Sequence, residues 1–182
     1  PIEYPEKTKN NFGENDLISV LNILKEILEN DKIKKIGQNI KYDALILFRN
    51  GIKISNIFLD TMVAAHVLNP SARSYKLDVL SLEFLNYNMV PIEDLIGKGK
   101  DQITMDLVPL DKIAFYAIED ADVVFQLAEL FVPKLEENGQ MEFFNKIEMP
   151  LINILMQMEN EGVYVDVKSL NEMSFRIGQE LD

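Results

Sequence analysis

The chain of 182 residues contains no cysteine and one histidine, His66. Without cysteine there is no disulfide bond, thiol nucleophile or cysteine-rich zinc site, and a single histidine excludes a site with several histidine ligands. No apolar run approaches the roughly 18 residues of a membrane-spanning helix, and no signal-peptide pattern opens the chain. These absences are compatible with a protein of the reducing cytoplasm.

Positive charge is also scarce. The chain has 18 Lys and Arg residues against 30 Asp and Glu residues, which gives a formal net charge of −12. Proteins that hold long nucleic-acid duplexes usually present a basic face, so the composition disfavours a duplex-binding module. A nuclease that takes a few nucleotides of a single-stranded end needs fewer phosphate contacts. Cations bound in its acidic site would also change the local charge.

The hydrophobic pattern predicts a mostly helical chain around one parallel strand–helix–strand unit. Strands are expected at Lys32–Ile36 and within 52–59, with Asn39 as the N-cap of the intervening helix and Asp60 as the cap of the helix that runs through Leu68. Pro133 is expected to end or kink the longest helix. Helices are predicted at 16–30, 40–49, 60–68, 75–85, 91–96, 111–132 and 144–160, and after Asp166.

Two short acidic motifs carry the chemistry: GQNIKYD at Gly37–Asp43 and YAIED at Tyr116–Asp120. Tyr116 and Asp120 are four residues apart and share one helical face. Asp120 is expected on the buried side and Asp122 in solvent. An unpaired buried carboxylate is expensive, and a divalent cation would relieve that cost. The expected apolar stripe on this face comprises Ile113, Ala117, Val124, Leu127 and Phe131.

Each motif taken alone also has a purely structural interpretation. The helix dipole favours a carboxylate in a first turn, where Asp43 is expected. A buried Asp120 could instead pair with an arginine or a backbone amide. Yet Asp43 follows a strand-to-helix turn, and ligands gather at the carboxyl ends of parallel strands. Only the two motifs together favour a catalytic site.

Together, the motifs resemble the 3′→5′ proofreading exonuclease domain of the bacterial DNA polymerase I family (family A, Klenow-type). Gly37–Asp43 matches the family pattern GQN-x-KYD, and Tyr116–Asp122 matches YA-x-EDAD. The resemblance covers about residue 31 to the C-terminus. Further matches are Asp60-Thr61-Met62, Gly97–Lys100, Ile147–Leu151 and Gly162–Asp166, the last two resembling the passage into the polymerase thumb.

The resemblance implies an α/β fold of the ribonuclease H-like exonuclease type, with a mixed five-stranded sheet flanked by helices. Residues 1–143 would be the C-terminal part of the exonuclease domain, and residues 144–182 would start the polymerase thumb region. The parent would be a bacterial cytoplasmic enzyme that synthesises DNA and proofreads single-stranded 3′ ends.

The resemblance also implies a site in which four acids hold two divalent metals, expected to be Mg with Mn or Zn possible. Asp120 would bind the tighter metal directly, Asp43 would anchor the second largely through water, and Tyr116 would orient the attacking water. The pocket for the terminal nucleotides would be lined by Gln38, Asn39 and Tyr42.

One element of the family pattern is absent. The first motif, an Asp-x-Glu that supplies the other two acids, occurs nowhere in the chain. It is expected upstream of Pro1 with the first three strands, so the chain alone is expected to be inactive. Its open sheet edge would leave it poorly stable or self-associating. Lesser departures are Ile92, where relatives have an aromatic residue, and Ser74, with the neighbouring arginine displaced to Arg73.

Two alternative functions remain. The first is a stand-alone exonuclease of the ribonuclease D type, which the thumb-like passage at 148–166 disfavours. The second is a non-catalytic structural module of a polymerase, which would fail to bind metal even with the upstream strands restored.

Overall fold

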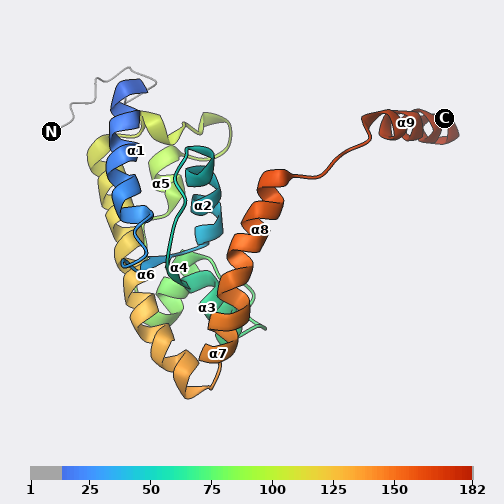
Figure 1. The fold of residues 1–182 in the computed structure, drawn as a ribbon. Helices are drawn as coiled ribbons and strands as arrows, with labels where there is room; N and C mark the ends of the chain where they lie inside the picture. Colours follow the sequence, from blue (N-terminus) through green and yellow to red (C-terminus); the bar gives the residue numbers. More distant parts are fainter. Residues whose placement is uncertain (1–13, 182) are drawn as a thin grey trace.

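The computed structural model describes the backbone of residues 14–181 (Figure 1). Short π-helical turns at Ser81–Leu85 and Phe144–Glu148 and 3₁₀ turns at Gly99–Asp101 and Met105–Leu107 join the main elements. These are α1 (Glu14–Leu28), β1 (Lys35–Gly37), α2 (Ile40–Arg49), β2 (Ile57–Asp60), α3 (Thr61–Leu68), α4 (Leu77–Leu80), α5 (Ile92–Ile96), α6 (Leu110–Glu137), α7 (Met141–Phe143), α8 (Met149–Glu161) and α9 (Val167–Leu181).

The two strands form a parallel sheet with α2 between them in sequence, as predicted. Lys35 pairs with Ile57 and Gly37 with Asp60, with an irregularity after Lys35. The predicted bounds of the first strand were wrong, because residues 31–34 form a turn. That turn is held by Asn56 Nδ2, which donates to the carbonyl of Asp31 at 2.7 Å.

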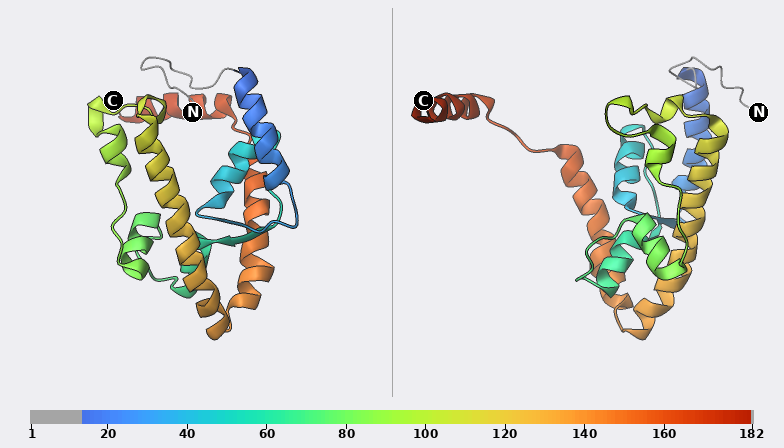
Figure 2. Two further views of the ribbon diagram at one scale, coloured as in Figure 1. Left: turned by 90° about the vertical axis from the view of Figure 1, so that its left-hand side faces the viewer. Right: turned by 180° about the vertical axis from the view of Figure 1, so that it is seen from behind.

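The sheet lies between α6 on one side and α2 with α8 on the other (Figure 2). One hydrophobic cluster joins these layers. The edge of the Phe84 ring meets the Phe131 ring with centroids 4.9 Å apart. The buried members of the cluster include Leu59, Ala64, Val123, Leu127, Phe131, Leu135, Phe144, Met149 and Ile152.

The longest helix, α6, continues through Pro133 to Glu137, so the prediction that it ends near Val132 was wrong. Phe131 and Leu135 are both fully buried on the same face, one on each side of the exposed Pro133. Core packing on both sides outweighs the roughly 3 kcal/mol that an internal proline costs a helix.

Asp60 joins the starts of two helices. It is 1% exposed, and its Oδ1 accepts hydrogen bonds from the amides of Met62 at 2.9 Å and Val63 at 3.2 Å, which confirms it as the cap of α3. The same carboxylate accepts from the amides of Ile40 at 2.7 Å and Asn39 at 3.2 Å. Asn39 occupies the predicted N-cap position of α2, but its side chain makes no capping hydrogen bond. Asp60, from the end of β2, therefore supplies the cap.

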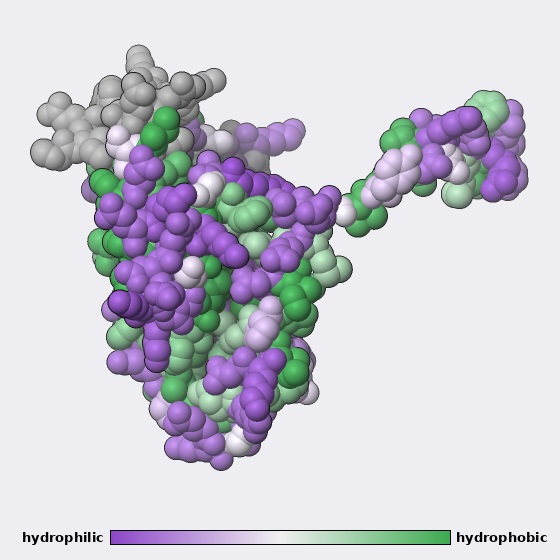
Figure 3. All heavy atoms as spheres, in the orientation of Figure 1, coloured by the Kyte–Doolittle hydropathy of each residue, from purple (hydrophilic) through white to green (hydrophobic). Residues whose placement is uncertain are grey.

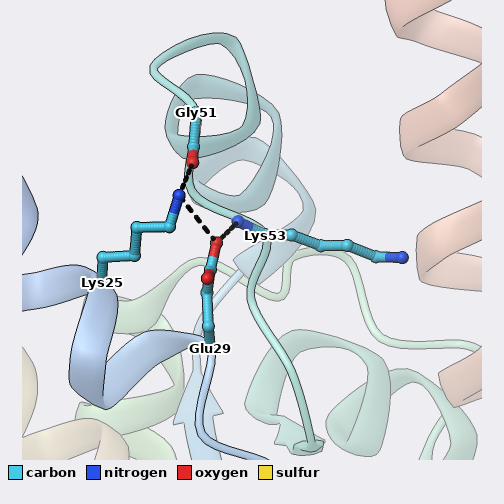
Figure 4. Close-up of polar contacts among 4 residues, drawn as sticks. All are labelled: Lys25, Glu29, Gly51 and Lys53. Carbon is cyan, nitrogen blue, oxygen red and sulfur yellow. Dashed lines mark hydrogen bonds and ion pairs between the residues drawn. The ribbon is translucent and has the colours of Figure 1, made fainter.

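Polar contacts hold α1 against the loop that follows α2 (Figure 4). Lys25 Nζ donates to the carbonyl of Gly51 at 2.9 Å, and Glu29 Oε1 accepts from the amide of Lys53 at 3.0 Å. Lys25 and Glu29 also form an ion pair at 3.6 Å. These contacts fasten the helix to the body largely by its C-terminal half.

The C-terminal helix α9 stands away from the body (Figure 1). Gly162 ends α8 with a φ of 74°, and the connecting residues Val163 and Tyr164 are 89% and 90% exposed. Apolar and polar side chains alternate on the surface of this arm (Figure 3). None of the described helices has the length and apolar character needed to cross a membrane.

We expect Asp60→Asn to lower the free energy of unfolding by about 1–3 kcal/mol, because the amide NH₂ cannot accept the hydrogen bonds of the lost carboxylate oxygen. Urea denaturation measures the change. Asp31→Asn, at an exposed aspartate, is the matched control and should shift stability by less than about 0.5 kcal/mol. Equal stability of the two variants would contradict the bridging role of Asp60.

Candidate active site

A cleft of about 670 Å³ opens at the carboxyl end of β1. Four parts of the chain form its walls: the β1–α2 turn with the start of α2, the start of α4, the segment before and into α5, and the middle of α6. It is lined by Ile36, Gly37, Gln38, Asp43, Lys76, Leu77, Asp78, Met89, Val90, Pro91, Ile92, Tyr116, Ala117, Asp120, Ala121 and Val124.

Local geometry directs Asp43 to this cleft. A Cβ on Gly37 would lie 3.0 Å from the side chain of Ile40, so the glycine lets the first turn of α2 pack closely on the end of β1. Asp60 then holds that turn through the amides of Asn39 and Ile40. Asp43 is in this turn, and its side chain is among those that line the cleft.

The cleft carboxylates carry unfavourable negative charge. Burial raises the pKa of Asp43, and the charge of Asp60 raises it further. Burial likewise raises the pKa of Asp120, with a second contribution from the charge of Glu119. Lys76 is the one cation among the residues lining the cleft. Binding of a cation beside these carboxylates would relieve part of this cost.

Tyr116 lies one turn before Asp120 on α6 and is half-buried. Burial raises the pKa of its hydroxyl, and the charges of Asp120, Glu119 and Asp78 add to that effect. The phenol therefore stays protonated at neutral pH and can donate one hydrogen bond while accepting another.

The cleft brings together four of the six site residues predicted from the sequence: Gln38, Asp43, Tyr116 and Asp120. Asn39 and Tyr42 are not among its lining residues, and the Tyr42 side chain is 62% exposed.

Gln38 already has partners within the protein. Its Nε2 donates to the carbonyl of Tyr75 at 2.8 Å, and its Oε1 accepts from the Thr61 hydroxyl. In this arrangement the side chain ties the β1–α2 turn to α3 and to the chain before α4.

The buried acid of the second motif is Glu119, which the sequence reading did not single out. Glu119 is 7% exposed, whereas Asp120 is half-buried at the edge of the packed face and Asp122 is exposed as expected. The expected stripe was also wrong at Ala117, which is exposed. A signal was present in the sequence, because Glu119, Val123 and Leu127 follow one another at intervals of four residues and so share one face of the helix. In the structure Val123 and Leu127 are fully buried.

Comparison with known sequences places the chain in a family. The sequence model of the 3′–5′ exonuclease of family A DNA polymerases matches residues 6–136. This chain belongs to that exonuclease family.

The curated relatives of this chain include bacterial DNA polymerases. DNA polymerase I of Rhizobium leguminosarum is 38% identical over 156 residues, which are 86% of this chain and 15% of the relative. DNA polymerase I of Pseudomonas aeruginosa is 34% identical over 169 residues, which are 91% of this chain and 18% of the relative. The chain thus spans less than a fifth of the length of these relatives.

Solved structures show the same fold. The POL domain of Pol1 from M. smegmatis, in complex with DNA primer-template and dNTP, matches 92% of this chain and 25% of its own with a TM-score of 0.70 at 19% identity. Brucella melitensis NrnC matches 74% of this chain and 60% of its own with a TM-score of 0.56 at 15% identity. The predicted ribonuclease H-like exonuclease fold is confirmed. The described residues contribute two strands of its sheet.

The acidic side chains of the cleft can be compared with the ligands that a divalent metal needs. Within residues 14–181, no three His, Cys, Asp or Glu side chains gather closely enough to hold a metal ion among themselves. Asp43 and Asp120 nevertheless present oxygen ligands from two helices in one cleft, and their pKa values are raised. Magnesium commonly takes one or two carboxylates and completes its shell with water and phosphate oxygens, so this donor set fits it.

We expect Asp120→Asn to increase thermal stability at about pH 7 and the gain to vanish near pH 4. The folded-state pKa of Asp120 lies above its unfolded value, so its ionised form is disfavoured by folding. The penalty is present at neutral pH and disappears as pH falls and the carboxyl becomes protonated. Melting curves at the two pH values measure it, with the exposed Asp122→Asn as control. A gain that is equal at both pH values would contradict this assignment.

Proposed function

We propose that this chain is most of the 3′→5′ proofreading exonuclease domain of a bacterial DNA polymerase I. Residues 1–143 would belong to the nuclease, and residues 144–182 would begin the polymerase thumb region of a cytoplasmic enzyme of DNA synthesis. The observation that carries the proposal is that one cleft contains Asp43 from the GQNIKYD motif with Tyr116 and Asp120 from the YAIED motif, although the two motifs are far apart in sequence.

In the proposed site, Asp43 and Asp120 supply carboxylate oxygens to two divalent metals, with Mg expected and Mn or Zn as alternatives. Bound there, the metals would stabilise the attacking and leaving oxygens of phosphodiester hydrolysis. The protonated phenol of Tyr116 orients the attacking water. The family resemblance implies two further acids, supplied by an Asp-x-Glu sequence. The chain contains no Asp-x-Glu sequence. We therefore propose that the chain alone has little or no activity.

The cleft supports a short single-stranded 3′ end of DNA as substrate. Its apolar wall at Met89, Pro91 and Ile92 can contact bases, whereas Lys76 is the one lining cation available to phosphates. The overall charge of −12 disfavours binding of a long duplex. Gln38, Asn39 and Tyr42 remain the proposed contacts to the terminal nucleotides.

Two other functions compete with this proposal. A stand-alone exonuclease is compatible with the fold likeness to NrnC, but that match covers less of this chain than the match to Pol1. A non-catalytic module is compatible with the missing acids and with the position of Asp43 in the first turn of α2. It gives no reason for a second acid with a raised pKa, Asp120, in the same cleft.

The decisive assay uses a polypeptide extended upstream into the parent gene. We expect Mg-dependent shortening of a 5′-labelled single-stranded oligonucleotide, reduced roughly a hundredfold or more by Asp120→Ala because a metal ligand is lost. Asp122→Ala, at the exposed neighbour, should retain the original rate. Absence of shortening in the unmodified polypeptide would mean that the motifs persist on a structural module, and the catalytic roles would fall. Robust shortening by the 182-residue chain, lost in Asp120→Ala, would contradict the proposed inactivity of the chain alone.

We also propose that the isolated chain is poorly stable or associates with a second copy through β1. Within residues 14–181, β2 is the only strand that pairs with β1, so the other edge of β1 has no strand partner. Such an edge can pair with a strand of another chain. Size-exclusion chromatography with light scattering should therefore show concentration-dependent dimers or larger species. A compact, stable monomer at all concentrations would contradict both alternatives.

A further inference from the structure

Glu119 is a buried carboxylate that the proposed hydrolysis does not use. It lies on α6, is 7% exposed, and forms none of the ion pairs in the described part of the chain. Both of its oxygens have partners in a single segment. Oε1 accepts from the Tyr87 hydroxyl at 2.7 Å, and Oε2 accepts from the amide of Val90 at 2.9 Å.

The segment that Glu119 holds has no regular secondary structure of its own. Residues 86–91 lie between the π-helical turn and α5. At its start, Ser81 Oγ donates to the carbonyl of Tyr87 at 2.9 Å. Glu119 supplies the two side-chain contacts that connect Tyr87 and Val90 to α6.

This segment continues directly into one wall of the cleft. Met89, Val90, Pro91 and Ile92 line that wall, while Tyr116 and Asp120 line the cleft from α6. Because Glu119 immediately precedes Asp120, its two hydrogen bonds connect the wall to the helical turn that bears the candidate catalytic groups.

A carboxylate suits this task better than other side chains. It offers two acceptor oxygens, and here one takes a hydroxyl and the other an amide. Because the side chain is buried, losing it would leave the Val90 amide and the Tyr87 hydroxyl without these partners. The hydrogen bond to Glu119 also raises the pKa of Tyr87, which keeps that hydroxyl a donor.

We propose that Glu119 is a positioning residue for the nuclease site. It clamps the Met89–Ile92 wall at a fixed separation from Tyr116 and Asp120, so that the terminal nucleotide of a single strand fits between them. This inference rests on the proposed function, since it concerns how the same cleft receives its substrate.

The test compares Glu119→Ala, Glu119→Gln and Tyr87→Phe in the full polymerase that we propose contains this chain. Hydrogen exchange of peptides spanning 86–92 reports the clamp, and single-stranded exonuclease kinetics report its effect. We expect Glu119→Ala to speed exchange in this segment and to raise KM roughly tenfold, with kcat changed less, because the wall is misplaced. Polymerase activity should be unchanged.

The two milder variants separate positioning from a general loss of folding. Tyr87→Phe removes one hydrogen bond from an exposed hydroxyl and should give a smaller KM increase with normal thermal stability. Glu119→Gln retains one acceptor oxygen and should partly restore both exchange protection and KM relative to Glu119→Ala.

Unchanged exchange in Glu119→Ala would overturn the clamp. Faster exchange with original KM and kcat in both Glu119→Ala and Tyr87→Phe would overturn its positioning role. If the unmodified polymerase shows no nuclease activity dependent on Asp120, the proposed function fails, and the positioning role fails with it. The unmodified enzyme therefore distinguishes failure of the function from failure of the inference.

Discussion

The carboxylate of Asp60 determines where the candidate site can form. It accepts hydrogen bonds from four backbone amides, two at the start of α2 and two at the start of α3, and thereby joins the two helices at the end of the parallel sheet. Burial raises the pKa of Asp60 and these amides lower it, with burial the larger effect. Its charge also raises the pKa of Asp43. Asp60 therefore positions Asp43 and also makes its negative charge more unfavourable, a cost that a bound cation would relieve.

The helix α6 performs two tasks along its length. Its C-terminal half is anchored in the core by Leu127, Phe131 and Leu135, which are fully buried. Its N-terminal half carries Tyr116 and Asp120 at the cleft, and here large apolar side chains such as Phe115 and Ile118 are 58% and 68% exposed. A rigid helix anchored at one end can hold catalytic groups at the other, provided that the opposite wall is also fixed.

The packed body does not end with the exonuclease motifs. Phe144, Met149 and Ile152 belong to the same buried cluster as the residues of α6, and Lys41 on α2 forms an ion pair with Glu159 on α8. No residue of α9 is buried. The segment that resembles the entry to a polymerase thumb therefore has two parts. The residues before Gly162 pack against the body, and from Gly162 onward the chain leaves it.

The sequence by itself determined the parallel strand–helix–strand unit and the cap at Asp60, which follow from hydrophobic periodicity and capping chemistry. It also indicated the family and the candidate catalytic groups Asp43, Tyr116 and Asp120, through the resemblance of its two motifs to a known exonuclease pattern. Only the tertiary structure decided that Asp60 rather than Asn39 caps α2, that α6 runs through Pro133, and that Glu119 is the buried acid beside a half-buried Asp120. The physical reason is that adjacent residues on a helix differ by only about 100° in direction. Which of them is buried depends on the segment that packs there, and Tyr87 and Val90 reach Glu119 from some thirty residues earlier in the chain.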